Sequence, residues 1–328
     1  MGQRRVSILL LIFSLPVSIW GCEKAKNGPT SAAETPTTQP IAQNITVASL
    51  VPAATDLLVG MGAAHHLVAI SNWDPDRPEI KDLPRVGDYR NVDWEKLAGL
   101  KPKVMIVQFS QGKMPAGLSE RASELGIQLV NVHNNRLADL FETIKLLGDA
   151  AGEPDKATRA AANLRQMLDQ IQQSSKTKPP VKVFLGRDAT ELASVGGGNF
   201  LDELLTLAGG VNIIQGGENS YPTIDREKLV SLNPQVVILL LPGVPQHVVA
   251  EARRFWSTLT ALQAVQDQRV FIWTEDYVLL PGLRVAEIAK RMQDILHPEL
   301  TKKPTTHPST QAAAASPPRH SPIPTGAL

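Results

Sequence analysis

Histidine, cysteine and carboxylate side chains carry out much of the chemistry of proteins, and in this sequence they are scattered. His65 and His66 are adjacent, whereas His133 and His247 stand alone. No carboxylate lies at a familiar metal-ligand spacing from any of them, and the His-Glu-x-x-His pattern of zinc proteases does not occur. The sequence therefore predicts no direct zinc site.

Motifs for nucleophilic catalysis and for phosphate binding are also missing. There is no Gly-x-Ser-x-Gly elbow, and the glycine run at residues 196–198 lacks the Gly-Lys-Ser/Thr that completes a phosphate loop. Residues 60–65 begin like a dinucleotide-binding loop, but they lack its final glycine and follow a predicted helix. Asp188 and Glu191 could form a carboxylate pair, although a solvated turn explains them better. We expect a binding protein, with a hydrolase as the alternative.

The N-terminal residues indicate export. Basic residues precede an apolar run from Val6 to Trp20, and Gly21 and Cys22 follow it. This order is typical of a signal peptide, and the run is too short for a comfortable membrane span. Cys22 lies where the lipobox of bacterial lipoproteins places its lipidated cysteine. We expect residues 1–22 to be a signal peptide ending in a lipidated Cys22, with a plain secretory signal or an uncleaved anchor as alternatives.

Charge and composition limit the function and the folded region. The chain has 33 basic and 32 acidic residues and no long basic run, which excludes an electrostatic footprint for nucleic acid. Residues 23–44 and 298–328 are rich in Pro, Ala and Thr and have no periodic apolar pattern. We expect a disordered linker and a disordered tail there, around a folded region at residues 45–297 that contains no disulfide.

Within the folded region, short β-branched runs alternate with amphipathic helical segments. This order is typical of parallel sheets flanked by helices. Strands are predicted at residues 45–48, 67–70, 104–107, 128–132, 181–185, 236–241 and 269–273, and helices include residues 53–61 and 118–125. The sequence therefore predicts an α/β protein with two Rossmann-like lobes, at residues 45–150 and 177–297.

One long helix should join the two lobes over residues 151–176. Glu153-Pro154-Asp155 provides a helix start with proline in the first turn. Apolar residues at spacings of four and three then form one stripe: Ala157, Ala161, Leu164, Leu168 and Ile171. The helix should run to about Gln173. Because one helix is stiffer than a crossover of several strands, we expect only a small closure around a ligand.

An internal repeat relates the two lobes. Residues 92–107 return as residues 224–239, at an offset of 132. In both copies an aspartate in N-cap position, Asp93 or Asp225, precedes a short helix, a proline ends it and a buried strand follows. We therefore expect lobes that are related by pseudo-twofold symmetry.

Five segments in a fixed order resemble the helix-linked, class III substrate-binding proteins of ABC importers for cobalamin, haem and iron-siderophores, particularly the cobalamin-binding members. The segments are residues 49–57 (SLVPAATDL), 85–89 (RVGDY), 100–104 (LKPKV), 199–203 (NFLDE) and 208–212 (AGGVN). The resemblance covers residues 45–297. It implies a monomer, at the periplasm or cell surface, that binds a ligand between two lobes and delivers it to an ABC permease.

The resemblance also implies roles for individual residues. Positions that would face the ligand are Pro52, Trp73, Tyr89, Gln108, Tyr221 and Asp276. Glu95 and Glu227 match the glutamates that dock into arginines of the two permease subunits, although Asp-x-Glu-Lys is also a favourable helix start.

The ligand that the resemblance implies is a metal chelate, and the protein needs no resident cofactor. A corrinoid suits aromatic side chains with a few hydrogen-bonding groups around them. Haem, held axially by His133 or Tyr277, and a ferric siderophore remain alternatives. The aromatic residues could also be ordinary loop anchors.

Overall fold

The computed structural model describes residues 45–110, 112–216 and 220–300. The predicted signal peptide, Cys22 and the linker lie outside these residues, as does the chain from residue 301 onward. Pro298–Leu300 form a short 3-10 helix, η2, in which the Leu300 amide donates to the His297 carbonyl at 3.0 Å. The predicted tail therefore begins three residues too early. Among the described helices, none has the length and apolar character to cross a bilayer.

The first lobe contains a four-stranded parallel sheet with the order β2-β1-β3-β4. Its strands are β1 (Val47–Ser49), β2 (Leu67–Ala69), β3 (Val104–Val107) and β4 (Gln128–Asn131). Its helices are α1 (Pro52–Gly60), α2 (Trp94–Leu100), α3 (Ala116–Glu124) and α4 (Leu137–Ala151), with the 3-10 helix η1 (Ala64–His66) before β2. Every residue of β3 is buried, as expected for a central parallel strand covered on both faces.

The second lobe repeats this topology with the order β6-β5-β7-β8. Its strands are β5 (Val181–Gly186), β6 (Gly210–Asn212), β7 (Val236–Leu240) and β8 (Val270–Trp273). Its helices are α6 (Phe200–Leu207), α7 (Arg226–Leu232), α8 (Gln246–Ser257), α9 (Gln263–Gln266) and α10 (Val285–Leu296). Strand β6 is missing from the sequence prediction, because it has only three residues and becomes a strand by pairing with β5.

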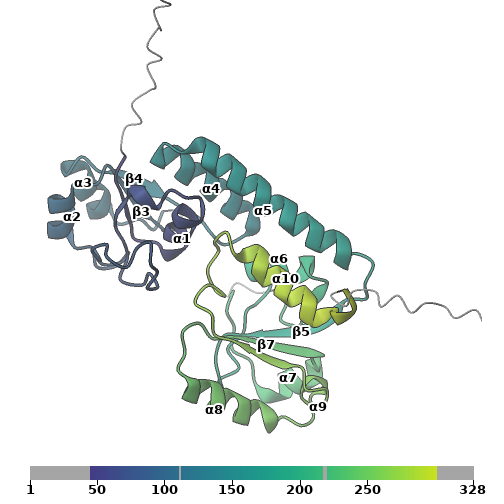
Figure 1. Cartoon of the computed structure of the whole chain (residues 1–328). Helices are drawn as coiled ribbons and strands as arrows, with labels where there is room; N and C mark the ends of the chain where they lie inside the picture. Colours follow the sequence, from purple (N-terminus) through teal and green to yellow (C-terminus); the bar gives the residue numbers. More distant parts are fainter. Residues whose placement is uncertain (1–44, 111, 217–219, 301–328) are drawn as a thin grey trace, which may run out of the picture. The chain divides into compact units, whose positions relative to one another are not determined.

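The helix α5 (Pro154–Ser175) is the predicted link between the lobes. Pro154 occupies its first turn, and Ala157, Leu164, Leu168 and Ile171 are buried along one stripe. The helix packs against α4 near its start and against α6 and α10 near its end (Figure 1). It ends at Ser175, within the predicted range of residues 151–176.

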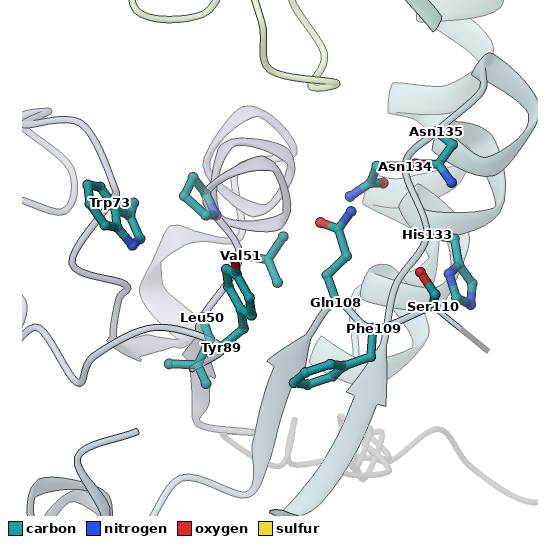
Figure 2. Close-up of a pocket in the computed structure, with 11 residues that line it drawn as sticks. Leu50, Val51, Trp73, Tyr89, Gln108, Phe109, Ser110, His133, Asn134 and Asn135 are labelled. Carbon is teal, nitrogen blue, oxygen red and sulfur yellow. The ribbon is translucent and has the colours of Figure 1, made fainter. Parts of the chain in front are cut away.

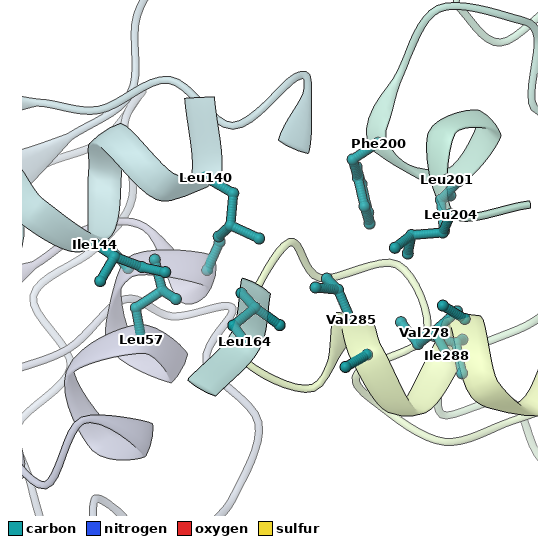
Figure 3. Packing of buried hydrophobic residues seen from close by; sticks show 14 of the residues in the cluster. Leu57, Leu140, Ile144, Leu164, Phe200, Leu201, Leu204, Val278, Val285 and Ile288 are labelled. Atoms are coloured by element: carbon teal, nitrogen blue, oxygen red, sulfur yellow. The ribbon is translucent and has the colours of Figure 1, made fainter. Parts of the chain in front are cut away.

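One apolar core continues from the first lobe through α5 into the second. Leu57 and Ile144 belong to the first lobe, Leu164 to α5, and Leu204 and Val285 to the second (Figure 3). All five side chains are buried. Since fully burying a leucine-sized side chain contributes roughly 1.5–3 kcal/mol, this shared cluster couples the folding of both lobes to α5.

The internal repeat is realised in the structure at the predicted offset. Helices α2 and α7 begin and end 132 residues apart. Asp93 and Asp225 are their N-caps, accepting the amides of Lys96 at 3.0 Å and Lys228 at 2.7 Å. Both helices end at a residue in the left-handed region, with φ 49° in the first copy and 43° in the second. The two lobes therefore share local caps as well as strand order.

Candidate functional site

A cavity of about 420 Å³ lies in the first lobe, where β1, β3 and β4 end. Pro52 at the start of α1, Gln108 after β3 and the stretch from His133 to Asn135 after β4 contribute to its lining. Ligands of α/β proteins commonly bind beyond the carboxyl ends of parallel strands. The location agrees with that rule, and the volume falls within the range of small-molecule sites.

Trp73 reaches the cavity from the loop after β2 (Figure 2). Trp73 is 69% exposed, so packing against the hydrophobic core does not fix its side chain. The indole Nε1–H donates to Oδ2 of Asp88 at 3.1 Å. Hydrogen bonds from the backbone N–H groups of Arg90 and Asn91 lower the pKa of Asp88, which keeps this acceptor charged. A polar contact therefore orients an exposed aromatic plane beside the cavity.

Tyr89 is the second aromatic residue of the lining, and it too is largely exposed. Its ring lies edge-on to Phe109, with centroids 6.3 Å apart, and the Arg90 guanidinium lies 5.3 Å from its centroid. The turn that carries Tyr89 needs Gly87, which has φ 96°: a Cβ there would lie 1.9 Å from the Asn91 carbonyl oxygen. Backbone geometry therefore positions this ring.

Asn134 is a lining residue that the sequence analysis missed. Only 4% of it is exposed, yet neither its Oδ1 nor its Nδ2 has a hydrogen-bond partner among the described residues. In Figure 2 its amide lies near that of Gln108, on the side of the cavity away from Trp73. A buried unpaired amide costs about 1–3 kcal/mol, which makes Asn134 a candidate for a ligand contact. The polar run directly after β4 is the signal that could have found it.

Asp74 is buried beside the loop that carries Trp73. Its Oδ2 accepts the Ser71 amide at 2.7 Å, while Oδ1 has no hydrogen-bond partner in the described part of the chain. Burial raises the pKa of Asp74 to about 6, and the Arg85 guanidinium only partly opposes this. The loop that carries Trp73 therefore contains a buried carboxyl group with a raised pKa.

Two predicted ligand residues belong to the second lobe and do not line this cavity. Tyr221 is exposed, and the Arg187 guanidinium lies 5.1 Å from its ring centroid. Asp276 forms an ion pair of 3.8 Å with Arg284, which also contacts the buried Asp56 at 3.2 Å. The structure thus gathers Pro52, Trp73, Tyr89 and Gln108 around one cavity and places the other two residues elsewhere.

The two candidate axial ligands for haem have different surroundings. His133 is exposed and lines the cavity. Tyr277 is partly buried against the core, with the Arg284 guanidinium 4.1 Å from its ring centroid. Burial, the largest influence, raises the pKa of Tyr277 above its usual value, so the phenol stays protonated. Of the two, only His133 lines the cavity.

Glu95 and Glu227 occupy equivalent places in the two lobes. Each lies in the first turn of its helix, α2 or α7, and each is exposed. Neither carboxylate takes part in a side-chain hydrogen bond or ion pair with the residues that the structure describes. A favourable helix N-terminus accounts for an acidic residue here, and both remain available to a partner.

Comparisons with known proteins agree with this fold. The family model described as "Periplasmic binding protein" matches residues 47–277. A vitamin B12-binding protein of Vibrio cholerae is 25% identical over 246 residues, which cover 75% of this chain and 87% of that protein. An uncharacterised ABC transporter substrate-binding lipoprotein of Bacillus subtilis is 25% identical over 263 residues, covering 78% and 81%.

Solved structures show the same architecture. The periplasmic vitamin B12-binding protein BtuF of Vibrio cholerae superposes with a TM-score of 0.65 at 23% identity, covering 78% of this chain and 98% of that one. A periplasmic haem-binding protein from Pseudomonas aeruginosa gives 0.65 at 23% identity, covering 77% and 92%. These likenesses confirm the two-lobed, helix-linked fold. Since the family model covers most of the chain, the protein belongs to the periplasmic binding protein family.

Proposed function

We propose that this protein is the substrate-binding component of an ABC importer and that its ligand is a corrinoid. The observation that supports this most directly is the cavity wall, in which two exposed aromatic side chains, Trp73 and Tyr89, stand opposite the buried, unpaired amide of Asn134. A corrinoid has a wide apolar face and amide groups around its rim, and it would match both features. The names of the vitamin B12-binding relatives support the same ligand class.

The proposal is a binding function, and the carboxylate pair suspected from the sequence lies outside the cavity. Asp188 and Glu191 are the suspected carboxylate pair. Oδ1 of Asp188 accepts the backbone N–H groups of Thr190 at 2.8 Å and Glu191 at 2.7 Å in a turn. Its oxygen is therefore occupied by local backbone groups. The relatives named above are binding proteins, which argues against the alternative of an exported hydrolase.

Titration with cobalamin, cobinamide, haemin and a ferric siderophore tests the proposal. We expect saturable corrinoid binding at one ligand per chain in calorimetry, and at least a tenfold loss of affinity in Trp73→Ala. Val230→Ala, at an exposed apolar residue of α7 in the second lobe, is the matched control and should bind like the wild type. Absence of corrinoid binding in the wild type would refute the ligand class without affecting the fold.

Haem is the second candidate ligand, and His133 is the observation that favours it. Its imidazole lines the cavity, and a neutral imidazole is a common axial ligand of haem iron. If haem is the ligand, His133→Ala should lose the absorption change that accompanies axial ligation. A haem absorption change that survives in His133→Ala would contradict axial ligation by this residue.

The proposal extends to the membrane partners. Glu95 and Glu227 would contact arginines on the two permease subunits, because charge-assisted carboxylate–guanidinium contacts fix register.

A lipidated Cys22 would hold the protein at the membrane, and the name of the Bacillus subtilis lipoprotein supports such an anchor. Metabolic labelling with a fatty acid tests the anchor: the label should be lost in Cys22→Ser.

A further inference from the structure

A second group of ligating side chains lies outside the cavity, at the start of the interlobe helix. His65 and His66 end η1, and Glu153 is the N-cap residue of α5. Together they offer two imidazole nitrogens and a carboxylate oxygen, all within 4.8 Å of one another. Sequence spacing does not reveal this site, because His66 and Glu153 are 87 positions apart. Only the folded chain brings a carboxylate to the histidine pair.

The spacing of the three ligand atoms suits a tetrahedral metal ion. Oε1 of Glu153 lies 3.5 Å from Nε2 of His65 and 3.3 Å from Nε2 of His66. Ligands of a tetrahedral zinc ion at about 2.0 Å from the metal are about 3.3 Å apart. Both distances from the carboxylate oxygen to the imidazole nitrogens are therefore close to the tetrahedral value. The distance between the two imidazole nitrogens is within 4.8 Å.

The hydrogen bonding of His66 prepares its Nε2 as a ligand. Nδ1 lies 2.8 Å from the carbonyl oxygen of Ile45, which can only accept, so Nδ1 carries the hydrogen. The other ring nitrogen, Nε2, faces Oε1 of Glu153 at 3.3 Å, a position where a proton or a metal ion can lie between the two atoms. Metal-binding histidines commonly donate their second nitrogen to a backbone carbonyl in this way. His66 is only 6% exposed, so its ring orientation is fixed.

One neighbour already places a cation beside Glu153. Glu153 makes no side-chain capping bond to its own helix. Nζ of Lys156 lies 2.7 Å from its Oε1 and 3.1 Å from the Gly62 carbonyl oxygen, so an ammonium supplies positive charge to the same carboxylate. His65 is exposed, which leaves room for a water molecule as the fourth ligand. Lys156 is therefore a competitor that a divalent ion would have to displace.

We propose that His65, His66 and Glu153 bind one Zn²⁺ ion, which joins η1 to the start of the interlobe helix. Two imidazoles and a carboxylate form a donor set that zinc favours among the metals of biological fluids. The site is independent of the ligand cavity, because none of the three residues lines it. It would stabilise the attachment of α5 to the first lobe.

Calorimetric titration of the full chain with Zn²⁺ alone tests this proposal. All samples carry Cys22→Ser, because a thiolate would itself bind zinc. His65→Ala and Glu153→Gln are the test variants, since both residues are at least partly exposed and their replacement leaves the core intact. His247→Ala, at an exposed histidine of α8, is the matched control. Lys156→Gln removes the competing ammonium.

We expect one zinc ion per chain, at least a tenfold loss of affinity in both test variants, no change in His247→Ala and tighter binding in Lys156→Gln. Zinc should also raise the Tm of the parent chain and of His247→Ala, but not of His65→Ala, since a ligand stabilises only the state that binds it. Wild-type zinc affinity in both His65→Ala and Glu153→Gln, or no zinc binding at all, would overturn the proposal. The group would then be an ion-pair cluster with Lys156 as its only cation.

Discussion

At the scale of single residues, two side chains of the cavity lining have environments that lower the stability of the ligand-free protein. Asn134 is buried, and neither atom of its amide forms a hydrogen bond with the described residues, so the free energy of removing the amide from water is not offset. Trp73 is the opposite case, a large aromatic side chain left 69% exposed. Both exceptions to ordinary burial occur around the same cavity. Such exceptions are typical of sites that a ligand completes.

Asn134→Ala should separate these two effects. Removing an unpaired buried amide should leave the free energy of unfolding of the ligand-free protein unchanged or up to about 1 kcal/mol higher. The same change should weaken corrinoid binding about tenfold, or about 1.4 kcal/mol. Urea denaturation and calorimetry measure the two quantities. A variant that is destabilised by several kcal/mol would instead give Asn134 a structural role.

Asp74 should make stability depend on pH. Its pKa is raised from 3.8 to about 6, so the folded state binds the proton more tightly than the unfolded state does. The stabilisation is complete below pH 4 and is lost as pH rises through about 6. Asp74→Asn, which keeps an acceptor for the Ser71 amide, should therefore match the wild type at pH 4 and exceed it by up to about 3 kcal/mol at pH 8. Urea titrations across this range measure the difference, and a difference independent of pH would contradict it.

At the scale of elements, the attachment of α5 depends on close helix packing. Gly148 on α4 faces Ala157 on α5 so closely that a Cβ at Gly148 would lie 2.2 Å from the Ala157 Cβ. The lobes are joined through this helix pair and the core that it continues. A single methyl group at this point should therefore push α5 away from α4.

Gly148→Ala should lower the free energy of unfolding by about 1–3 kcal/mol, the usual cost of overpacking. Gly99→Ala is the matched control, because Gly99 lies within α2 and its added Cβ would meet nothing within 4 Å. That control should be neutral or stabilising by up to about 1 kcal/mol, since alanine favours the helix. Urea denaturation compares the two variants, and equal stability would show that α4 and α5 adjust without strain.

At the scale of the whole molecule, the repeat places an exposed glutamate in the first turn of one helix in each lobe. Helices α2 and α7 share their bounds, their aspartate N-caps and their left-handed ends at an offset of 132 residues. Leu97 in α2 and Leu229 in α7 are both fully buried, so packing against the core accounts for a leucine at each position. Nothing in the packing requires Glu95 and Glu227, because both are exposed.

Replacing Glu95 and Glu227 together by alanine should leave ligand affinity unchanged, since neither residue lines the cavity. Ligand uptake through the permease in reconstituted vesicles should fall at least tenfold. Glu120→Ala with Glu251→Ala, at exposed acids of α3 and α8, is the matched control and should transport normally. Normal transport by the first pair would assign both glutamates to helix initiation alone.

The sequence by itself determined the features that rest on local patterns. Seven of the eight described strands, the start of α5 at Pro154 and the aspartate caps of the repeat follow from burial periodicity and from capping chemistry within a few residues. The family resemblance, and not a local pattern, pointed to Pro52, Trp73, Tyr89 and Gln108, and these four residues line one cavity. The short strand β6 was missed because its pairing with β5, not its composition, makes it a strand.

Only the tertiary structure decided the features that depend on distant segments. It buried the Asn134 amide with no partner among the described residues, raised the pKa of Asp74, and brought Glu153 to His65 and His66. Solvation and the distances between ligand atoms are set by the neighbours that folding supplies. A sequence specifies those neighbours only through the complete fold, which is why the zinc site was predicted to be absent and now stands as a proposal.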